Sequence, residues 1–145
     1  MLLPVSGVPL IRYMLSWLRN YGITEVAINT FSLADKIVGY LGDGSKFGIK
    51  ITYSREEVLL GTAGGVKRIE SFFEDTFVVV YGDMLLDFDL SEMIRFHCDK
   101  KALITVALAE ITATWQYGIV GITDDGRITS FVEKPREGTE PSNLS

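Results

Sequence analysis

Strand-like segments alternate with helix-like segments along most of this 145-residue chain. This alternation favours an α/β domain with a mainly parallel sheet and right-handed crossovers. The expected helices span 9–21, 32–41, 62–73 and 89–101, and the expected strands span 25–29, 49–53, 77–83 and 103–110. A hairpin is expected where residues 118–122 and 127–133 flank the turn sequence TDDG. We therefore predict one domain over residues 1–135, followed by a flexible tail over residues 136–145, which has little to bury.

Composition narrows the class of protein. The net charge is −5, which argues against a general nucleic-acid surface but leaves a nucleotide ligand open. No apolar run approaches the roughly 18 residues that a membrane span needs, so no membrane association is expected. Cys98 is the one cysteine, which excludes an intramolecular disulfide and fits a reducing compartment. We expect a cytoplasmic protein.

Asp83 ends the expected strand FVVVYGD. Its continuous apolar run is typical of a strand buried on both faces, and ligands of open α/β sheets bind at the carboxyl ends of strands. A carboxylate at that position suits Mg²⁺, which takes oxygen ligands beside a phosphate. The alternative is an aspartate that only caps a helix or closes a turn.

The stretch GTAGG (residues 61–65) opens the next expected helix. It is neither a Walker A loop nor a G-x-G-x-x-G sequence. Three glycines and two small residues would let a flat base lie against the backbone. The alternative is a flexible surface turn.

Two further segments could contact a sugar phosphate. In FVEKP, Glu133 offers an acceptor for a hydroxyl and Lys134 offers a cation for a phosphate. Read alone, the pair is better explained as a solvated pair on an edge strand. Tyr117 and Gly118 could line a sugar pocket, or could belong to a turn and the core.

The order of these segments is more specific than any one of them. Taken together, they resemble the sugar-1-phosphate nucleotidyltransferases, the NDP-sugar pyrophosphorylases. The resemblance rests on LLPVSGVPLIRYMLSWLRNYGITEVAIN, LGTAGGVK, VVVYGDMLLDFDL, YGIV and FVEKP, and it covers Leu2 to Pro135. It implies a Rossmann-like, GT-A-like three-layer αβα fold.

The resemblance also implies a reaction. An oxygen of a sugar-1-phosphate attacks the α-phosphate of an NTP, and the products are an NDP-sugar and pyrophosphate with Mg²⁺ as cofactor. By the same resemblance, Gly61, Thr62, Ala63 and Gly64 contact the base and ribose, and Asp83 is a catalytic metal ligand. Tyr117 and Gly118 border the sugar, Glu133 binds a sugar hydroxyl, and Lys134 is a catalytic residue that binds the sugar phosphate.

The sequence departs from the family at both ends. The glycine-rich triphosphate loop and the family's first strand, which should precede LLPV, are absent, as is the second metal-binding aspartate. We therefore expect weak or no turnover by this chain alone. The missing strand would lie between residues 25–29 and 77–81, so we expect those segments either to pair directly or to be covered in a homo-oligomer. A non-catalytic nucleotide- or sugar-phosphate-binding module and an assembly subunit remain the alternatives.

Overall fold

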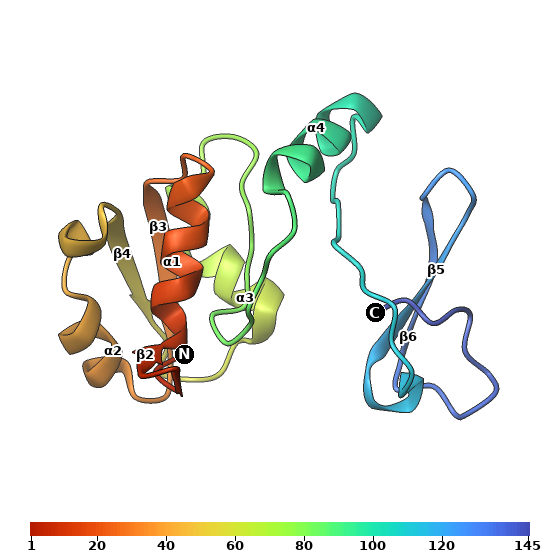
Figure 1. Cartoon of the computed structure of the whole chain (residues 1–145), viewed down its shortest axis with the longest axis horizontal. Coiled ribbons are helices and arrows are strands. Elements are labelled where there is room, and N and C mark those ends of the chain that lie inside the picture. Colours follow the sequence, from red (N-terminus) through yellow and green to blue (C-terminus); the bar gives the residue numbers. More distant parts are fainter. The chain divides into compact units, whose positions relative to one another are not determined.

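The computed structural model describes all 145 residues, and the chain divides into two compact units, residues 1–91 and 92–145. Each unit is described by itself. The first contains β1 (Pro4–Val5), β2 (Val8–Pro9), α1 (Leu10–Asn20), β3 (Glu25–Thr30), α2 (Ala34–Leu41), β4 (Lys50–Arg55) and α3 (Gly61–Arg68) (Figure 1). Helix α4 (Leu90–Lys100) begins at the boundary, and the second unit continues with β5 (Gly118–Ile122) and β6 (Ile128–Glu133). Three short 3₁₀ turns are η1 (Ser45–Phe47), η2 (Glu70–Phe72) and η3 (Thr114–Gln116).

The core of the first unit forms between α1, α2 and the pair β3–β4. Apolar residues recur at helical spacing in α1, so that one face of the helix is buried. The buried cluster consists of Ile11, Leu15, Ile28, Ile37, Leu41, Ile49 and Ile51. This packing holds the two strands side by side and fixes where both of them end.

Strands β3 and β4 are parallel, with Glu25 opposite Lys50 and Thr30 opposite Arg55. The chain passes from one to the other through α2, as the alternating pattern predicts. The pairing continues one step past β4, where the Glu56 amide donates to the Thr30 carbonyl at 2.8 Å. Both strands therefore end together, and α3 follows from this end after a short loop.

The prediction of strands at 77–83 and 103–110 is wrong, because neither segment is part of a strand. A strand exists only through hydrogen bonds to a neighbour, and β3 pairs with β4 alone. In the first of these segments, Phe77, Val79 and Tyr81 are 45%, 52% and 56% exposed. Residues 77–83 thus have a strand-forming sequence but no neighbouring strand to pair with. The pair β3–β4 is the one parallel pair of strands.

The expected hairpin is confirmed in the second unit. Strands β5 and β6 pair antiparallel, and the Thr123 amide donates to the Arg127 carbonyl at 2.9 Å across the turn. Residues 143–145 also pair: the amides of Ala109 and Ile111 donate to the carbonyls of Ser145 and Asn143. The segment expected as a flexible tail therefore makes backbone hydrogen bonds, while the domain boundaries themselves stay a prediction.

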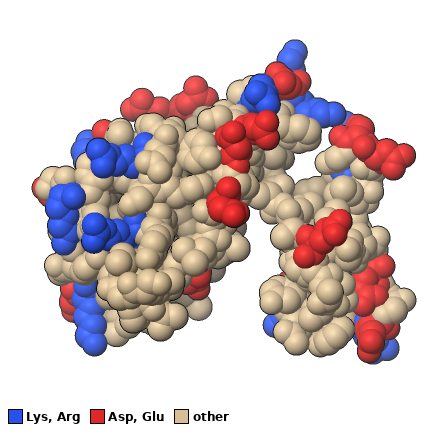
Figure 2. Space-filling model, in the orientation of Figure 1, with Lys and Arg blue, Asp and Glu red and all other residues tan.

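Charge is unevenly spread over the first unit. Figure 2 shows Lys and Arg side chains gathered on the side that carries α2 and β4, with a few acidic side chains among them. Lys50 and Arg55 of β4 form ion pairs with Glu25 and Asp35. None of the helices combines the length and the apolar character that crossing a membrane requires.

Candidate active site

The glycine stretch forms the beginning of α3 rather than a separate loop. Gly61 is the first helical residue and has a φ of +71°, a left-handed conformation that glycine adopts without steric cost. No side chain caps this helix, and Leu60 stands at its N-cap position. The first N–H groups of a helix lack partners within the helix, so this end can receive a ligand's acceptor atoms.

A buried carboxylate supports this beginning of α3. Glu56 is 4% exposed, and its Oε2 accepts a hydrogen bond from the Leu60 amide at 3.2 Å. Its Oε1 accepts one from Asn29 Nδ2 at 3.2 Å. A Cβ on Gly65 would lie 3.0 Å from both Asn29 Nδ2 and Glu56 Oε1. Helix α3 therefore packs directly on the Asn29–Glu56 pair.

Sequence reasoning missed Glu56 and Asn29. The rule that selected Asp83, a polar residue at the carboxyl end of a strand, applies equally to Glu56, which directly follows β4. Asn29 is the penultimate residue of β3. The position of each residue at the end of a strand was the signal that could have identified it.

The segment that carries Asp83 reaches α3 through one contact. The hydroxyls of Tyr81 and Thr62 lie 3.3 Å apart, which brings the residues before Asp83 beside the first turn of the helix. Asp83 itself is exposed, in a turn where the Met84 amide donates to the Tyr81 carbonyl at 3.3 Å. The first unit thus brings the glycine stretch and the Asp83 segment together.

The hairpin of the second unit brings the two predicted sugar-phosphate segments together. Gly118 lies opposite Glu133, and the Lys134 amide donates to the Tyr117 carbonyl at 3.0 Å. Residues 15 or more positions apart in sequence therefore become direct neighbours at one end of the hairpin. Their roles toward a ligand stay predictions.

Lys134 has an unusual backbone conformation, with a φ of +45°. A non-glycine residue in the left-handed region carries a conformational cost, and such residues cluster at functional sites. Lys134 lies at the end of β6, between the exposed Glu133 and the buried Pro135. The fold therefore holds the lysine of FVEKP in a strained turn beside Tyr117.

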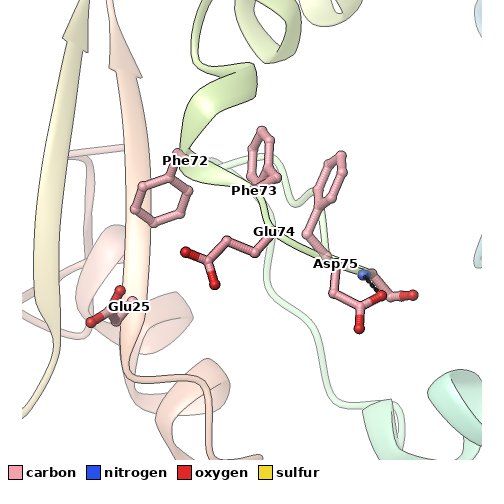
Figure 3. A pocket seen from close by; sticks show the side chains of 7 residues that line it. Glu25, Phe72, Phe73, Glu74 and Asp75 are labelled. Carbon is pink, nitrogen blue, oxygen red and sulfur yellow. Dashed lines mark hydrogen bonds between the residues drawn. The ribbon is translucent and has the colours of Figure 1, made fainter.

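A pocket of about 270 Å³ lies elsewhere in the first unit. It is lined by Glu25, at the start of β3, and by residues 72–77. Phe72 and the Glu74 carboxylate point toward Glu25 (Figure 3). Because Glu25 stands at the amino end of β3, this pocket does not coincide with the residues that the sequence selects.

The described residues contain no group of three or more His, Cys, Asp and Glu side chains that could hold a metal ion. Mg²⁺ does not require such a cage, because it keeps several waters and commonly binds one or two carboxylates with substrate phosphates. The exposed carboxylate of Asp83 fits that mode of binding.

The curated proteins that this chain resembles include sugar-1-phosphate nucleotidyltransferases. UTP–glucose-1-phosphate uridylyltransferase of Synechocystis sp. is 36% identical over 92% of this chain and 38% of its own length. D-glycero-alpha-D-manno-heptose 1-phosphate guanylyltransferase of Aneurinibacillus thermoaerophilus is 35% identical over 90% of this chain and 56% of its own length. The chain thus spans between about a third and somewhat over half of these relatives.

Solved structures agree in fold. A Bacillus anthracis protein described as a glucose-1-phosphate thymidylyltransferase superposes with a TM-score of 0.87 at 27% identity, over 99% of this chain and 58% of that one. The fold is that of the α/β nucleotidyltransferases, which confirms the predicted fold class. Residues 1–144 match the family described as nucleotidyl transferase, and the chain belongs to that family. The resemblance read from the sequence segments is thereby confirmed.

Proposed function

We propose that this chain carries the nucleotide- and sugar-phosphate-binding part of a sugar-1-phosphate nucleotidyltransferase. The reaction joins the nucleoside monophosphate part of an NTP to a sugar-1-phosphate, giving an NDP-sugar and pyrophosphate. The observation that carries the proposal is the beginning of α3, where Gly61 to Gly64 stand at the carboxyl ends of a parallel strand pair. Open α/β sheets bind ligands at this edge.

Each residue then has a role. The backbone of Gly61, Thr62, Ala63 and Gly64 contacts base and ribose, since small residues leave room for a flat ring. Glu133 accepts a hydrogen bond from a sugar hydroxyl, and Lys134 pairs with the sugar phosphate. Tyr117 and Gly118 border the sugar, and their contact with the Glu133–Lys134 segment supports this assignment.

Asp83 would hold Mg²⁺. When bound, this ion neutralises phosphate charge and helps to orient the leaving pyrophosphate. The exposed position of the Asp83 carboxylate, after a segment that contacts α3 through Tyr81, supports the assignment. Asp83 and Lys134 are accordingly the proposed catalytic residues.

Pyrophosphate release tests this function. The purified chain is incubated with Mg²⁺, each of the four NTPs, and mannose- or glucose-1-phosphate. Where the chain shows the weak turnover expected of it, Asp83→Ala should abolish that turnover, whereas Asp124→Ala, which removes an exposed carboxylate in the hairpin turn, should keep it. No release with any substrate pair would mean that the chain keeps the family's fold but not its chemistry. Equal loss in both variants would contradict the role of Asp83.

A second candidate is a non-catalytic binding module or assembly subunit. The exposed, unpaired segment 77–81 favours it, because apolar side chains without a neighbour are suited to a partner. Ligand-dependent thermal stabilisation without pyrophosphate release would indicate a binding module, whereas stable oligomers with neither effect would indicate an assembly subunit.

We further propose a cytoplasmic homo-oligomer. The unpaired segment 77–81 and the free edge of β3 support association, since unpaired strand edges readily add a further strand. The single free Cys98 supports a reducing compartment. Sedimentation of the purified chain tests the first statement, and cell fractionation tests the second.

A further inference from the structure

We infer that Glu56 is a positioning residue that fixes the turn leading into α3, and with it the conformation of Gly61 to Gly64. This inference rests on the proposed function, in which those residues contact a nucleotide. It concerns a side chain that no sequence segment singled out.

Burial is the first step of the inference. Glu56 is 4% exposed, and removing a carboxylate from water is costly unless hydrogen bonds compensate. Both observed partners are neutral N–H groups, those of Leu60 and Asn29. An apolar residue of similar size could not replace this carboxylate, because the carboxylate accepts hydrogen bonds from two donors at once.

The two donors lie at the N-cap of α3 and on strand β3. Leu60 is the N-cap residue of α3. Its amide donates to the carboxylate of Glu56, which lies four residues earlier in the chain. Gly61, directly after it, takes the left-handed conformation with a φ of +71°. The hydrogen bond therefore restrains the residue before a glycine that has little preference of its own.

Helix α3 also contacts the Asn29–Glu56 pair through Gly65. Gly65 is the one buried residue of α3, and a Cβ there would approach Glu56 Oε1 and Asn29 Nδ2 to 3.0 Å. The glycine stretch is thus held at Leu60, before its first residue, and at Gly65. Asn29 orients the carboxylate from the neighbouring strand β3. The residues between Leu60 and Gly65 are therefore restrained to one conformation.

A variant without any acceptor gives a direct test. Glu56→Leu keeps much of the side-chain volume but leaves the N–H groups of Leu60 and Asn29 without a partner. Glu56→Gln keeps an acceptor for the Leu60 amide, and its own N–H group can donate to Asn29 Oδ1 once the Asn29 amide turns over. Glu56→Gln should therefore retain both hydrogen bonds. Glu57→Leu, at the exposed neighbouring position, is the matched control.

Two quantities are measured in the 145-residue chain and its variants: the exchange rate of the Leu60 amide by NMR, and the dissociation constants of ATP, CTP, GTP and UTP. We expect Glu56→Leu to speed Leu60 exchange about tenfold or more and to weaken the binding of all four nucleotides by a common factor of about ten. Glu56→Gln should retain most of the native exchange rate and affinity, and Glu57→Leu should match the unchanged protein.

Three results would overturn the inference. These are unchanged Leu60 exchange in Glu56→Leu, loss of affinity for one base alone, or a Glu56→Gln variant no better than Glu56→Leu. Loss for one base alone would mean that Glu56 contacts the ligand itself. If Glu56→Leu fails to fold, Glu56→Gln should still keep the native melting temperature, and its failure to do so counts against the inference. If the unchanged protein binds no NTP, the proposed function fails, while Leu60 exchange still decides the role of Glu56.

Discussion

Gly118 and Glu133 lie opposite each other at the end of the β5–β6 hairpin, where an added side chain on Gly118 would meet the side chain of Glu133. A Cβ on Gly118 would lie 3.0 Å from Glu133 Oε2 and 2.5 Å from Phe131 Cζ. Both atoms are the far ends of exposed side chains, so an added methyl group on Gly118 would push these side chains aside. This relationship joins the two segments to which we assign the sugar phosphate.

Gly118→Ala should consequently destabilise the hairpin and displace Glu133. Because the exposed Phe131 ring and Glu133 carboxylate can turn away from the new methyl group, we expect a loss of at most about 1 kcal/mol in the free energy of unfolding. Urea denaturation measures this loss, and sugar-1-phosphate titration should show weaker binding. Gly39→Ala is the control, since a Cβ on that α2 glycine meets nothing within 4 Å. It should be neutral or slightly stabilising, and equal loss in both variants would contradict the packing argument.

The backbone strain at Lys134 leads to a second prediction. Lys134→Gly removes the cost of a left-handed φ of +45° but also removes the cation. We expect the free energy of unfolding to rise by up to about 1 kcal/mol, while affinity for a sugar-1-phosphate falls. Thermal denaturation and ligand titration measure the two effects.

Lys101→Gly is the matched control, because Lys101 has a φ of +50° after α4 and lies outside the predicted site residues. It should show the same gain in stability with unchanged ligand affinity. If Lys101→Gly weakens binding as much as Lys134→Gly, the assignment of Lys134 to the phosphate is wrong.

The elements that sequence patterns predicted correctly are those whose stability is local or between near neighbours. Helix α1 follows from its apolar spacing, and the hairpin follows from a TDDG turn between two β-rich runs. Residues 77–83 carry an equally clear strand pattern, yet they form no strand because pairing requires a neighbour that propensity cannot supply.

The candidate site shows the same division. The contact between Gly118 and Glu133 could be anticipated in kind, because both segments belong to one hairpin. The Asn29–Glu56 pair depends on the parallel register of β3 and β4, which no local pattern encodes. Glu56 could be nominated by its place after a strand, but not its burial or its bond to Leu60.

The exposed segment 77–81 leads to a third prediction, which concerns association. Val79→Lys places a charge on a side chain that is 52% exposed, so the folded monomer should tolerate it. If this segment forms the contact between copies, the variant should weaken self-association about tenfold or more, because a buried unpaired charge is costly. Sedimentation equilibrium over a range of concentrations measures the effect. Val38→Lys, at an exposed position of α2, should leave association unchanged.

The fourth prediction concerns Glu140 and the C-terminal residues. Thr114 Oγ1 donates a 2.6 Å hydrogen bond to Glu140 Oε1, and this bond, with backbone donors, lowers the pKa of Glu140 below its ordinary value of 4.5. A carboxyl group with a lowered folded pKa stabilises the folded state fully above its unfolded pKa. That stabilisation is lost as the pH falls through the folded value. The contact should therefore hold residue 140 in place at neutral pH and release it only in acid below pH 4.5.

An NMR titration of the Glu140 side chain checks this sign. Thr114→Val keeps the shape of residue 114 but removes the donor, so the Glu140 midpoint should rise toward 4.5. Thr112→Val, which removes an exposed hydroxyl two residues away, should leave the midpoint unchanged. A midpoint at or above 4.5 in the unchanged protein would show that Thr114 does not hold the carboxylate. In that case the C-terminal residues would be held by the backbone hydrogen bonds of residues 143–145 and not through Glu140.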